Sequence, residues 1–399
     1  MQPSRFFVSV VSIGLGSLLS ACQTTGEVSS NPASPNNTAS TNVVESKISF
    51  PQDYFVESIS GESCQSSRDF DAGITYVRQL ETLGPNWNAK GNSLTVDHND
   101  MSKRWAALLE LSYTAAATNN AEQSKELIRT LVYLAENKLL LDALKTNDIK
   151  SRCYAGSGDV KAKCPYHIPQ HTSFTFTAML NAANVLNEHT TQQERSVLES
   201  YFASAYADFI KPLASSGLRA QSFYEFGDGG LGVLAYARFT NDKSLAESEI
   251  ESRKNALIRV INDEGYIDNN SYRGVRAYWY HTLGANSAYG YALVAREFGI
   301  DFFRDPTLGP KLKALAEKIV EGTVDYKKFM SKGNRGTNHS KDPEDARPHM
   351  HQLAVSLPTI LKREFGIDVP LSSAYIRKGR NETIDRIIGF NADCYYASK

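Results

Sequence analysis

The chain has 399 residues, of which 43 are Lys or Arg and 44 are Asp or Glu, so its formal net charge is −1. This length suits one large domain or two ordinary ones, and the balanced charge carries no signature of nucleic-acid binding. We therefore expect no nucleic-acid partner, and any attraction to an anionic partner must come from local clusters. The 20 tyrosines fit either sugar binding, through ring stacking and hydroxyl contacts, or an ordinary core.

The N-terminal residues 1–22 have the form of a bacterial lipoprotein signal peptide. Arg5 precedes the apolar run FFVSVVSIGLGSLLSAC, which is too short to span a bilayer stably. The run ends in Leu-Ser-Ala-Cys, where a small residue precedes the cleavage point and the thiol of Cys22 takes the lipid. An ordinary secretory signal is the alternative. Gln23 rather than Asp follows the cysteine, which favours a lipid-anchored protein of the outer membrane, facing the periplasm or the cell surface.

Residues 23–47 are predicted to be a flexible tether. They begin QTTGEVSSNPASPNNTASTNVVES, which is rich in Ser, Thr, Asn and Pro and has almost no apolar content. Such a segment cannot bury enough apolar surface to pack. We assign residues 48–399 to a single folded domain.

Four cysteines remain after Cys22, an even number that suggests disulfides in an exported protein. Cys153 and Cys164 flank a short glycine-containing loop, so we expect them to pair. Cys64 and Cys394 would then join the two ends of the domain, although four free thiols are an alternative. The cysteines form no close CxxC pairs, so we expect no metal site.

Helical periodicity dominates the folded domain. Apolar residues recur at three- and four-residue spacing, and short turns separate the segments. The expected helices lie within residues 105–117, 124–144, 176–189, 193–214, 231–240, 246–261, 285–299, 311–326 and 350–366. No convincing strand alternation interrupts them, which predicts an all-α domain. No fixed repeat is present, which argues against consensus solenoids and favours a single α/α toroid, an incomplete α/α barrel.

One stretch of the sequence carries a family resemblance. Residues 262–303 read NDEGYIDNNSYRGVRAYWYHTLGANSAYGYALVAREFGIDFF. They resemble the alginate lyase family of α/α-toroid polysaccharide lyases, through Asp263, Glu264, Gly265, Tyr266, Arg273, Arg276, Ala277, Tyr280, His281 and residues 299–301. The resemblance implies β-elimination beside a uronate, in which a base removes the C5 proton, the 4-O-glycosidic bond breaks and a double bond forms.

This chemistry needs a base and a group that neutralises the uronate carboxylate. Tyrosine suits proton transfer once nearby cations lower its pKa from about 10. Arg273 and Tyr280 are seven residues apart, or two helical turns, so we expect them on one helical face. We predict that Tyr280 is the base and acid, with Arg273 as its activator and carboxylate contact. Arg276 and His281 are predicted substrate contacts, and the alternative is that these are interface residues of an inner helix.

The family's Asn-Asn-His-x-Tyr-Trp motif is absent from this chain, and so is a further tyrosine three residues after Tyr280, where Leu283 stands. The region equivalent to the motif is RAQSFYEFGDGGLG, residues 219–232, which offers the predicted substrate contacts Arg219, Tyr224, Glu225 and Asp228. The carboxylates could act as acid and base, bind sugar hydroxyls, or hold the two arginines in place.

The groove histidine must then come from elsewhere. The candidates are His167, His171, His339, His349 and His351, and we favour His171, which lies just before a helix. The two long polar loops, residues 149–173 and 330–349, are of the length that often serves function. The second contributes Lys332 and Arg335, which we expect to hold substrate carboxylates.

The sequence as a whole therefore predicts a polysaccharide lyase. Its substrate would be an anionic, uronate-containing polysaccharide, either alginate or an exopolysaccharide, and we expect no metal or organic cofactor. Two alternatives keep the same fold. One is a glycoside hydrolase that uses Glu225 and Asp228 as acid and base, and the other is a non-catalytic lipoprotein that binds polysaccharide.

Overall fold

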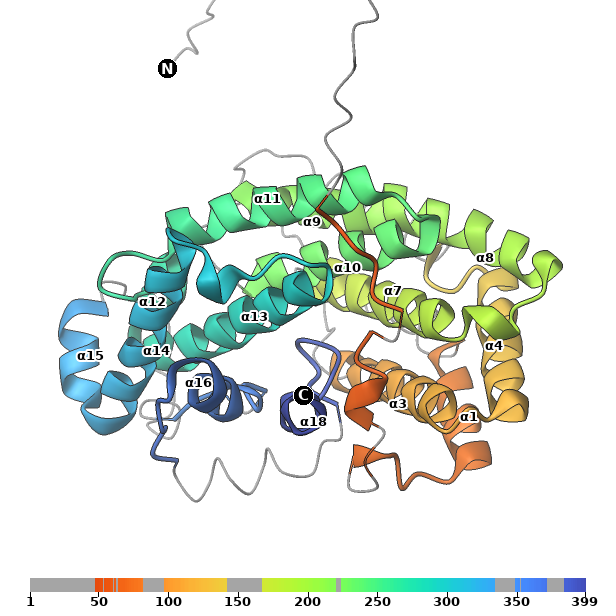
Figure 1. Cartoon of the computed structure of the whole chain (residues 1–399), viewed down its shortest axis with the longest axis horizontal. Coiled ribbons are helices and arrows are strands. Elements are labelled where there is room, and N and C mark those ends of the chain that lie inside the picture. Colours follow the sequence, from red (N-terminus) through yellow and green to blue (C-terminus); the bar gives the residue numbers. More distant parts are fainter. Residues whose placement is uncertain are drawn as a thin grey trace, which may run out of the picture. The chain divides into compact units, whose positions relative to one another are not determined.

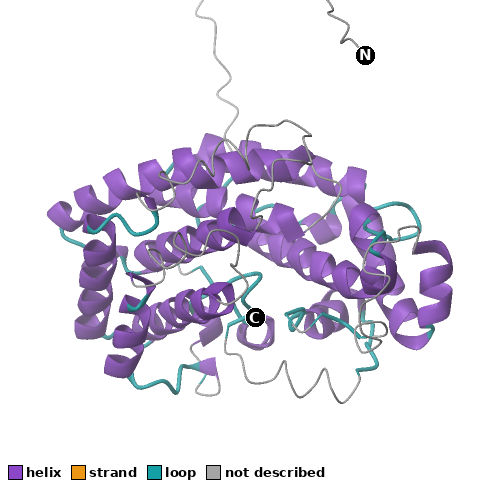
Figure 2. Cartoon of the chain, turned by 180° about the vertical axis from the view of Figure 1, so that it is seen from behind, coloured by secondary structure: helices purple, strands orange, loops and turns teal. Residues whose placement is uncertain are grey.

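A computed structural model of the chain describes residues 47–52, 54–59, 61, 64–81, 97–141, 167–219, 224–333, 349–351, 353–371 and 384–399. The predicted signal peptide, residues 23–46 of the tether, the Cys153–Cys164 pair and Arg335 lie outside the described residues. Residues Ser46–Lys399 form one compact unit. Within the described ranges the secondary structure is helical, with one isolated antiparallel bridge between Ile261 and Ile267 (Figure 2). None of the helices in these ranges is long and apolar enough to cross a membrane.

Four helices form the inside of the fold. They are α3 (Asp97–Ala117), α7 (His167–Val185), α10 (Tyr224–Thr240) and α13 (Ala277–Glu297). Small and apolar residues surround their axes, and every residue of α13 from 281 to 295 is buried. A helix that is buried on all sides belongs in the interior of a large fold. The four pack side by side in chain order, α3 on α7, α7 on α10 and α10 on α13.

A second set of helices covers this inner set (Figure 1). It consists of α4 (Ala121–Glu136), α8 (Gln192–Ala205), α9 (Lys211–Arg219), α11 (Lys243–Val260) and α14 (Leu308–Val324). A π-helical turn, Tyr206–Ile210, joins α8 to α9. Side chains of Asn120, Thr191 and Asp242 cap the first turns of α4, α8 and α11 by accepting backbone N–H groups. These capping residues set where each outer helix begins.

The inner helices all run in the same direction. Their last turns meet around Tyr54, which lies near Tyr113 of α3, Asn181 of α7 and Arg238 of α10. The guanidinium of Arg238 is 5.0 Å from the centre of the Tyr54 ring, and Glu297, the last residue of α13, lines a cavity with Tyr54. We call this side, marked by Tyr54, the finishing end. The first turns of α3, α7, α10 and α13 define the opposite side, the starting end.

The C-terminal part of the chain closes the ring. Residues 384–391 bridge α13 and α3, since the Nη1 of Arg386 donates to the Oγ of Ser102 at 3.1 Å and Ile388 packs on Gly290. A Cβ on Gly290 would lie 1.9 Å from the Cγ2 of Ile388, so only glycine fits there. The helices α16 (Leu357–Phe365) and α18 (Ala392–Ser398) pack beside this segment (Figure 1). The prediction of an all-α toroid is confirmed.

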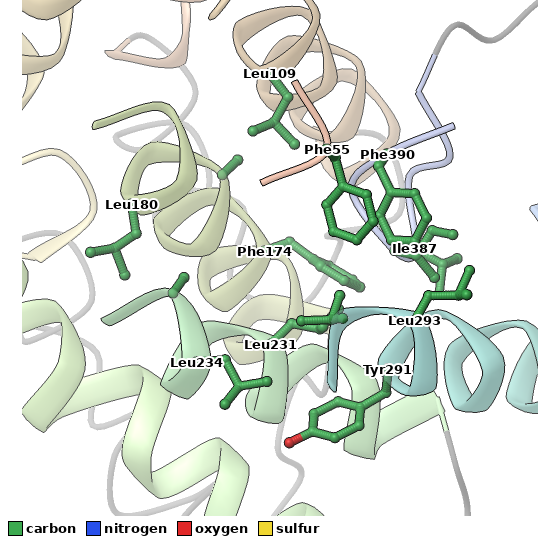
Figure 3. Packing of buried hydrophobic residues seen from close by; sticks show 14 of the residues in the cluster. Phe55, Leu109, Phe174, Leu180, Leu231, Leu234, Tyr291, Leu293, Ile387 and Phe390 are labelled. Atoms are coloured by element: carbon green, nitrogen blue, oxygen red, sulfur yellow. The ribbon is translucent and has the colours of Figure 1, made fainter. Parts of the chain in front are cut away.

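Aromatic side chains and a disulfide hold the finishing end together. Phe55 stacks on Phe390 with ring centres 3.7 Å apart, among side chains from all four inner helices (Figure 3). Cys64 and Cys394 form a disulfide, as predicted, across 330 residues of sequence. The segment that precedes α3 is thereby joined covalently to α18.

Candidate active site

Tyr280 lies in the first turn of α13, at the starting end, and a sharp change of direction precedes it. The short helix α12 (Asp268–Ser271) ends before Gly274, which has φ +58°, and a 3₁₀ turn, Gly274–Arg276, leads into α13 at Ala277. Glycine adopts this positive φ without strain. The expectation that Arg273 and Tyr280 share one helical face is therefore wrong, because Arg273 lies before the helix begins.

The fold nevertheless brings these two residues together. The guanidinium carbon of Arg273 is 5.0 Å from the centre of the Tyr280 ring, and both side chains are half-buried. The Nε of Arg273 donates to the carbonyl of Asn269 at 3.3 Å, and the Nδ2 of the buried Asn270 donates to the carbonyl of Tyr280 at 2.9 Å. The segment before α13 thus contacts both the main chain of Tyr280, through Asn270, and its side chain, through Arg273. A guanidinium over an aromatic ring is a favourable electrostatic contact.

A second arginine and a tryptophan extend this cluster. The guanidinium carbon of Arg276 is 5.2 Å from the centre of the Trp279 ring. Trp279 in turn meets Tyr280 edge to face, with ring centres 5.0 Å apart. One guanidinium group therefore lies over the phenol of Tyr280, and a second lies over the indole that packs against that phenol.

His281 belongs to the core and not to the site. Its ring lies between Tyr266 and Phe329, and its Nδ1 accepts the N–H of Ile267 at 3.4 Å. Burial, and secondarily the charge of Lys318, lower the pKa of His281 to about 3, so the ring is neutral. The side chain is fully buried, and a polymer cannot reach it. The prediction that His281 contacts substrate is wrong, because Tyr280 and His281 project from different sides of the helix.

A different histidine lies against the cluster. The ring of His351 packs on Trp279 with centres 4.0 Å apart, and its backbone N–H donates to the Oγ1 of Thr282 at 2.9 Å across 69 residues of sequence. Burial, and secondarily the charge of Arg276, lower the pKa of His351 to about 3. The sequence offers this residue only as one candidate among several, since nothing in its spacing points to α13.

His171, the favoured histidine, lies in the second turn of α7 and is half-buried. Its ring is 5.9 Å from that of Phe174, which stacks on Trp105 of α3. Because α7 and α13 run in the same direction, His171 is at the starting end with Tyr280. Its role in catalysis stays a prediction.

The remaining predicted contacts are placed only in part. Tyr224, Glu225 and Asp228 occupy the first two turns of α10, and so lie at the starting end, but their side chains fall outside the described residues. Arg219 is the exposed last residue of α9.

Two residues of the family-like stretch have structural roles. Asp263 forms an exposed ion pair with Lys311, with a nitrogen–oxygen distance of 2.8 Å. Gly265 has φ +85°, and a Cβ there would lie 2.1 Å from the carbonyl oxygen of Ala314. Both residues therefore shape the turn against α14, and they contribute nothing to the cluster around Tyr280.

The cavity at the finishing end is remote from this cluster. It has a volume of about 200 Å³ and is lined by residues of the N-terminal segment, α13 and α18, including Tyr54, Glu297 and Tyr395. Tyr280 and Glu297 lie at opposite ends of α13, and about 25 Å of helix separates them at 1.5 Å per residue. This cavity is therefore no part of the candidate site.

An α/α toroid with arginines around a tyrosine at one end has the architecture and the chemical groups expected of a polysaccharide lyase. Comparison with known families supports this class, since the family model described as alginate lyase matches residues 72–329. The chain belongs to the alginate lyase family, and this membership supports polysaccharide lyase activity in general terms. A comparison with curated proteins gives no match.

Proposed function

We propose that the protein cleaves a uronate-containing anionic polysaccharide, either alginate or an exopolysaccharide, by β-elimination. The observation that carries this proposal is the guanidinium of Arg273 lying 5.0 Å from the centre of the Tyr280 ring. The placement suits the reaction because it sets a cation, which can bind the carboxylate of the sugar, beside a phenol that can reach the proton on the neighbouring carbon.

In the proposed step, the Tyr280 phenolate takes the proton from C5 of the uronate. The electrons of that C–H bond form the C4–C5 double bond, and the bond from C4 to the glycosidic oxygen breaks. Tyr280 then returns its proton to the departing oxygen, so that no oxidant or reductant is consumed. Arg273 and Arg276 hold the carboxylate and stabilise the negative charge that develops beside it.

The direction of the inner helices supports the same assignment. The N-termini of α3, α7, α10 and α13 gather at the starting end, and each helix N-terminus carries a partial positive charge. Together with the two arginines, they favour an anionic chain at this end of the toroid. Local charge can therefore attract a polyuronate even though the whole protein has a formal net charge of −1.

The test is a panel of purified polyuronates and bacterial exopolysaccharides, followed in the ultraviolet. A lyase releases an unsaturated uronate that absorbs there, and new reducing ends appear in equal number. Reducing ends without absorbance would indicate the hydrolase alternative instead. Polymer binding without either product would indicate a binding lipoprotein. Either of these two results would overturn the proposal.

We also propose that the mature protein is a lipoprotein of the bacterial cell envelope, anchored through Cys22 and placed at the outer membrane. The support is the apolar run that ends in Leu-Ser-Ala-Cys, followed by a Ser/Thr/Asn-rich stretch. Mass spectrometry of the mature N-terminus should find a lipid-modified Cys22, and Cys22→Ala should move the protein out of the membrane fraction. A mature N-terminus at another residue would contradict this proposal.

A further inference from the structure

A histidine from the C-terminal part of the chain packs on the turn of α13 that bears Tyr280. His351 is the last residue of the short described segment 349–351, which precedes α16 in the chain. Its N–H donates to Thr282, and its carbonyl accepts the N–H of Ala354 at 2.9 Å. The backbone is thus fixed on both sides of the ring. His351 also lies outside residues 72–329, the part of the chain that matches the family.

The hydrogen bonds of the ring define its state. The Nδ1 of His351 accepts the N–H of Leu353 at 3.0 Å, so in the neutral ring the hydrogen is on Nε2. A neutral ring can lie near the guanidinium of Arg276 without repulsion. A protonated ring in the same place would repel that cation, since His351 is buried and Arg276 is half-buried beside it.

Trp279 connects this histidine to the candidate catalytic groups. Its indole contacts the His351 ring, with centres 4.0 Å apart and planes inclined by 38°. The same indole contacts the guanidinium of Arg276 and the ring of Tyr280, at 5.2 and 5.0 Å. Trp279 therefore contacts His351, Arg276 and Tyr280 at once, and a change at His351 can reach the other two groups through the indole.

We propose that His351 is a positioning residue, which holds Trp279 so that the Arg276 guanidinium and the Tyr280 ring keep the geometry needed to bind and deprotonate a uronate. This inference rests on the proposed function. It assigns to a residue beyond the family-like stretch an indirect part in binding the substrate carboxylate.

The decisive experiment is a double-mutant cycle of His351→Ala with Arg276→Ala, using the polyuronate that the native protein cleaves fastest. We expect His351→Ala to lower kcat/KM about tenfold, mainly through a higher KM, because Arg276 loses its place. In the Arg276→Ala background the same change should cost about twofold, because only the part that acts through Tyr280 remains. An equal loss in both backgrounds, or no loss in either, would overturn the inference.

Two further variants separate the ring contact from the hydrogen bond. His351→Phe keeps a ring on Trp279 and loses the acceptor for Leu353, whereas His351→Asn keeps an acceptor and loses the ring. We expect the Phe variant to retain more activity than the Asn variant, and the reverse order would contradict the proposed role of Trp279. His281→Phe is the matched control on the same helix, since its side chain faces the core. Thermal unfolding of each variant identifies a temperature at which all are folded, and the Phe and Asn variants complete the cycle if the Ala variant does not fold.

The failure of the inference can be told apart from that of the proposed function. If the native protein forms no unsaturated product from any polymer, the proposed function fails. The same cycle is then measured by calorimetry with an alginate tetrasaccharide, in which Arg276 and His351 should couple in affinity. Native turnover with independent effects of the two residues, or no coupling in the binding measurement, overturns the inference alone.

Discussion

At the finishing end of the toroid, arginines contact both carboxylates and aromatic rings, whereas the contacts described for Arg273 and Arg276 at the starting end are with aromatic rings and a backbone carbonyl. Arg296, in the last turn of α13, contacts Glu364 at 2.7 Å and Asp301 at 3.2 Å. Tyr395 donates to Glu297 at 2.8 Å. Arg273 and Arg276, before the first turn of the same helix, instead face Tyr280 and Trp279. The two ends of α13 therefore differ in that ion pairs with carboxylates are described for the arginine at its last turn.

The difference follows from what each end has to do. Ion pairs and stacked rings at the finishing end satisfy charge within the protein and close the ring. A planar guanidinium can stack on an aromatic ring and can also bind a carboxylate, and so Arg273 and Arg276 suit the binding of an anionic sugar. Changes at the two ends should consequently separate stability from activity.

The largest effect should come from Tyr280→Phe. Loss of the phenolic oxygen removes the proposed base and acid, so we expect kcat to fall about 10³-fold, within the range that proton transfer contributes to catalysis. Affinity for the polymer should change little, because the ring remains beside the arginines. Ultraviolet assays and calorimetry measure the two quantities, and unchanged turnover would remove Tyr280 from the mechanism.

The next effect concerns the finishing end. The double variant Cys64→Ser, Cys394→Ser removes the disulfide, and we expect the free energy of unfolding to fall by about 3 kcal/mol, since the unfolded chain gains freedom. Denaturant titration measures this loss. Below the unfolding transition kcat should match that of the native protein, and a parallel loss of activity would show that the two ends are coupled.

Acidification should act on the starting end through its buried histidines. The pKa of His281 and that of His351 are each about 3 in the folded protein, against about 6.5 in an unfolded chain. Between these values the unfolded state binds more protons, so stability falls as the pH falls from 7. At pH 5 the loss is about 2 kcal/mol for each histidine.

His281→Phe provides the check on this prediction. Between pH 7 and pH 5, the free energy of unfolding of the variant should fall less than that of the native protein. The difference should equal the contribution of His281, about 2 kcal/mol. Denaturant titrations of both proteins at the two pH values give the difference. The same pH dependence in both would mean that His281 titrates normally in the folded state.

The smallest effect should come from Asp263→Asn. Asp263 belongs to the family-like stretch, yet its carboxylate is exposed and pairs only with Lys311 in the described contacts. We expect no measurable change in kcat/KM or in the unfolding temperature, because exposed ion pairs contribute little. A large loss of activity would show that the turn containing Asp263 belongs to the active site. It would contradict the assignment of a structural role to this residue.

Much of the architecture could be predicted from residue patterns alone. Three- and four-residue apolar spacing predicted the helices, because helices form through contacts that are local in sequence. The absence of a repeat argued against a solenoid and so favoured a toroid. The pairing of Cys64 with Cys394 followed from counting and from the short loop between the other two cysteines. The Arg273–Tyr280 pair was also predicted, although the geometric reason was wrong, since Gly274 ends the helix that spacing had assumed.

The sequence by itself could not identify which histidine lies beside the Tyr280 cluster. Residue order placed His281 next to the tyrosine, but a helix turns by about 100° per residue, and that rotation directs His281 into the core. His351 reaches Trp279 because tertiary packing brings its segment onto α13, where its backbone N–H donates to Thr282. The sequence determined which segments are helical and which phenol and guanidinium are close along the chain. The tertiary structure decided which distant imidazole completes the cluster, because such contacts depend on how the helices pack and not on their spacing.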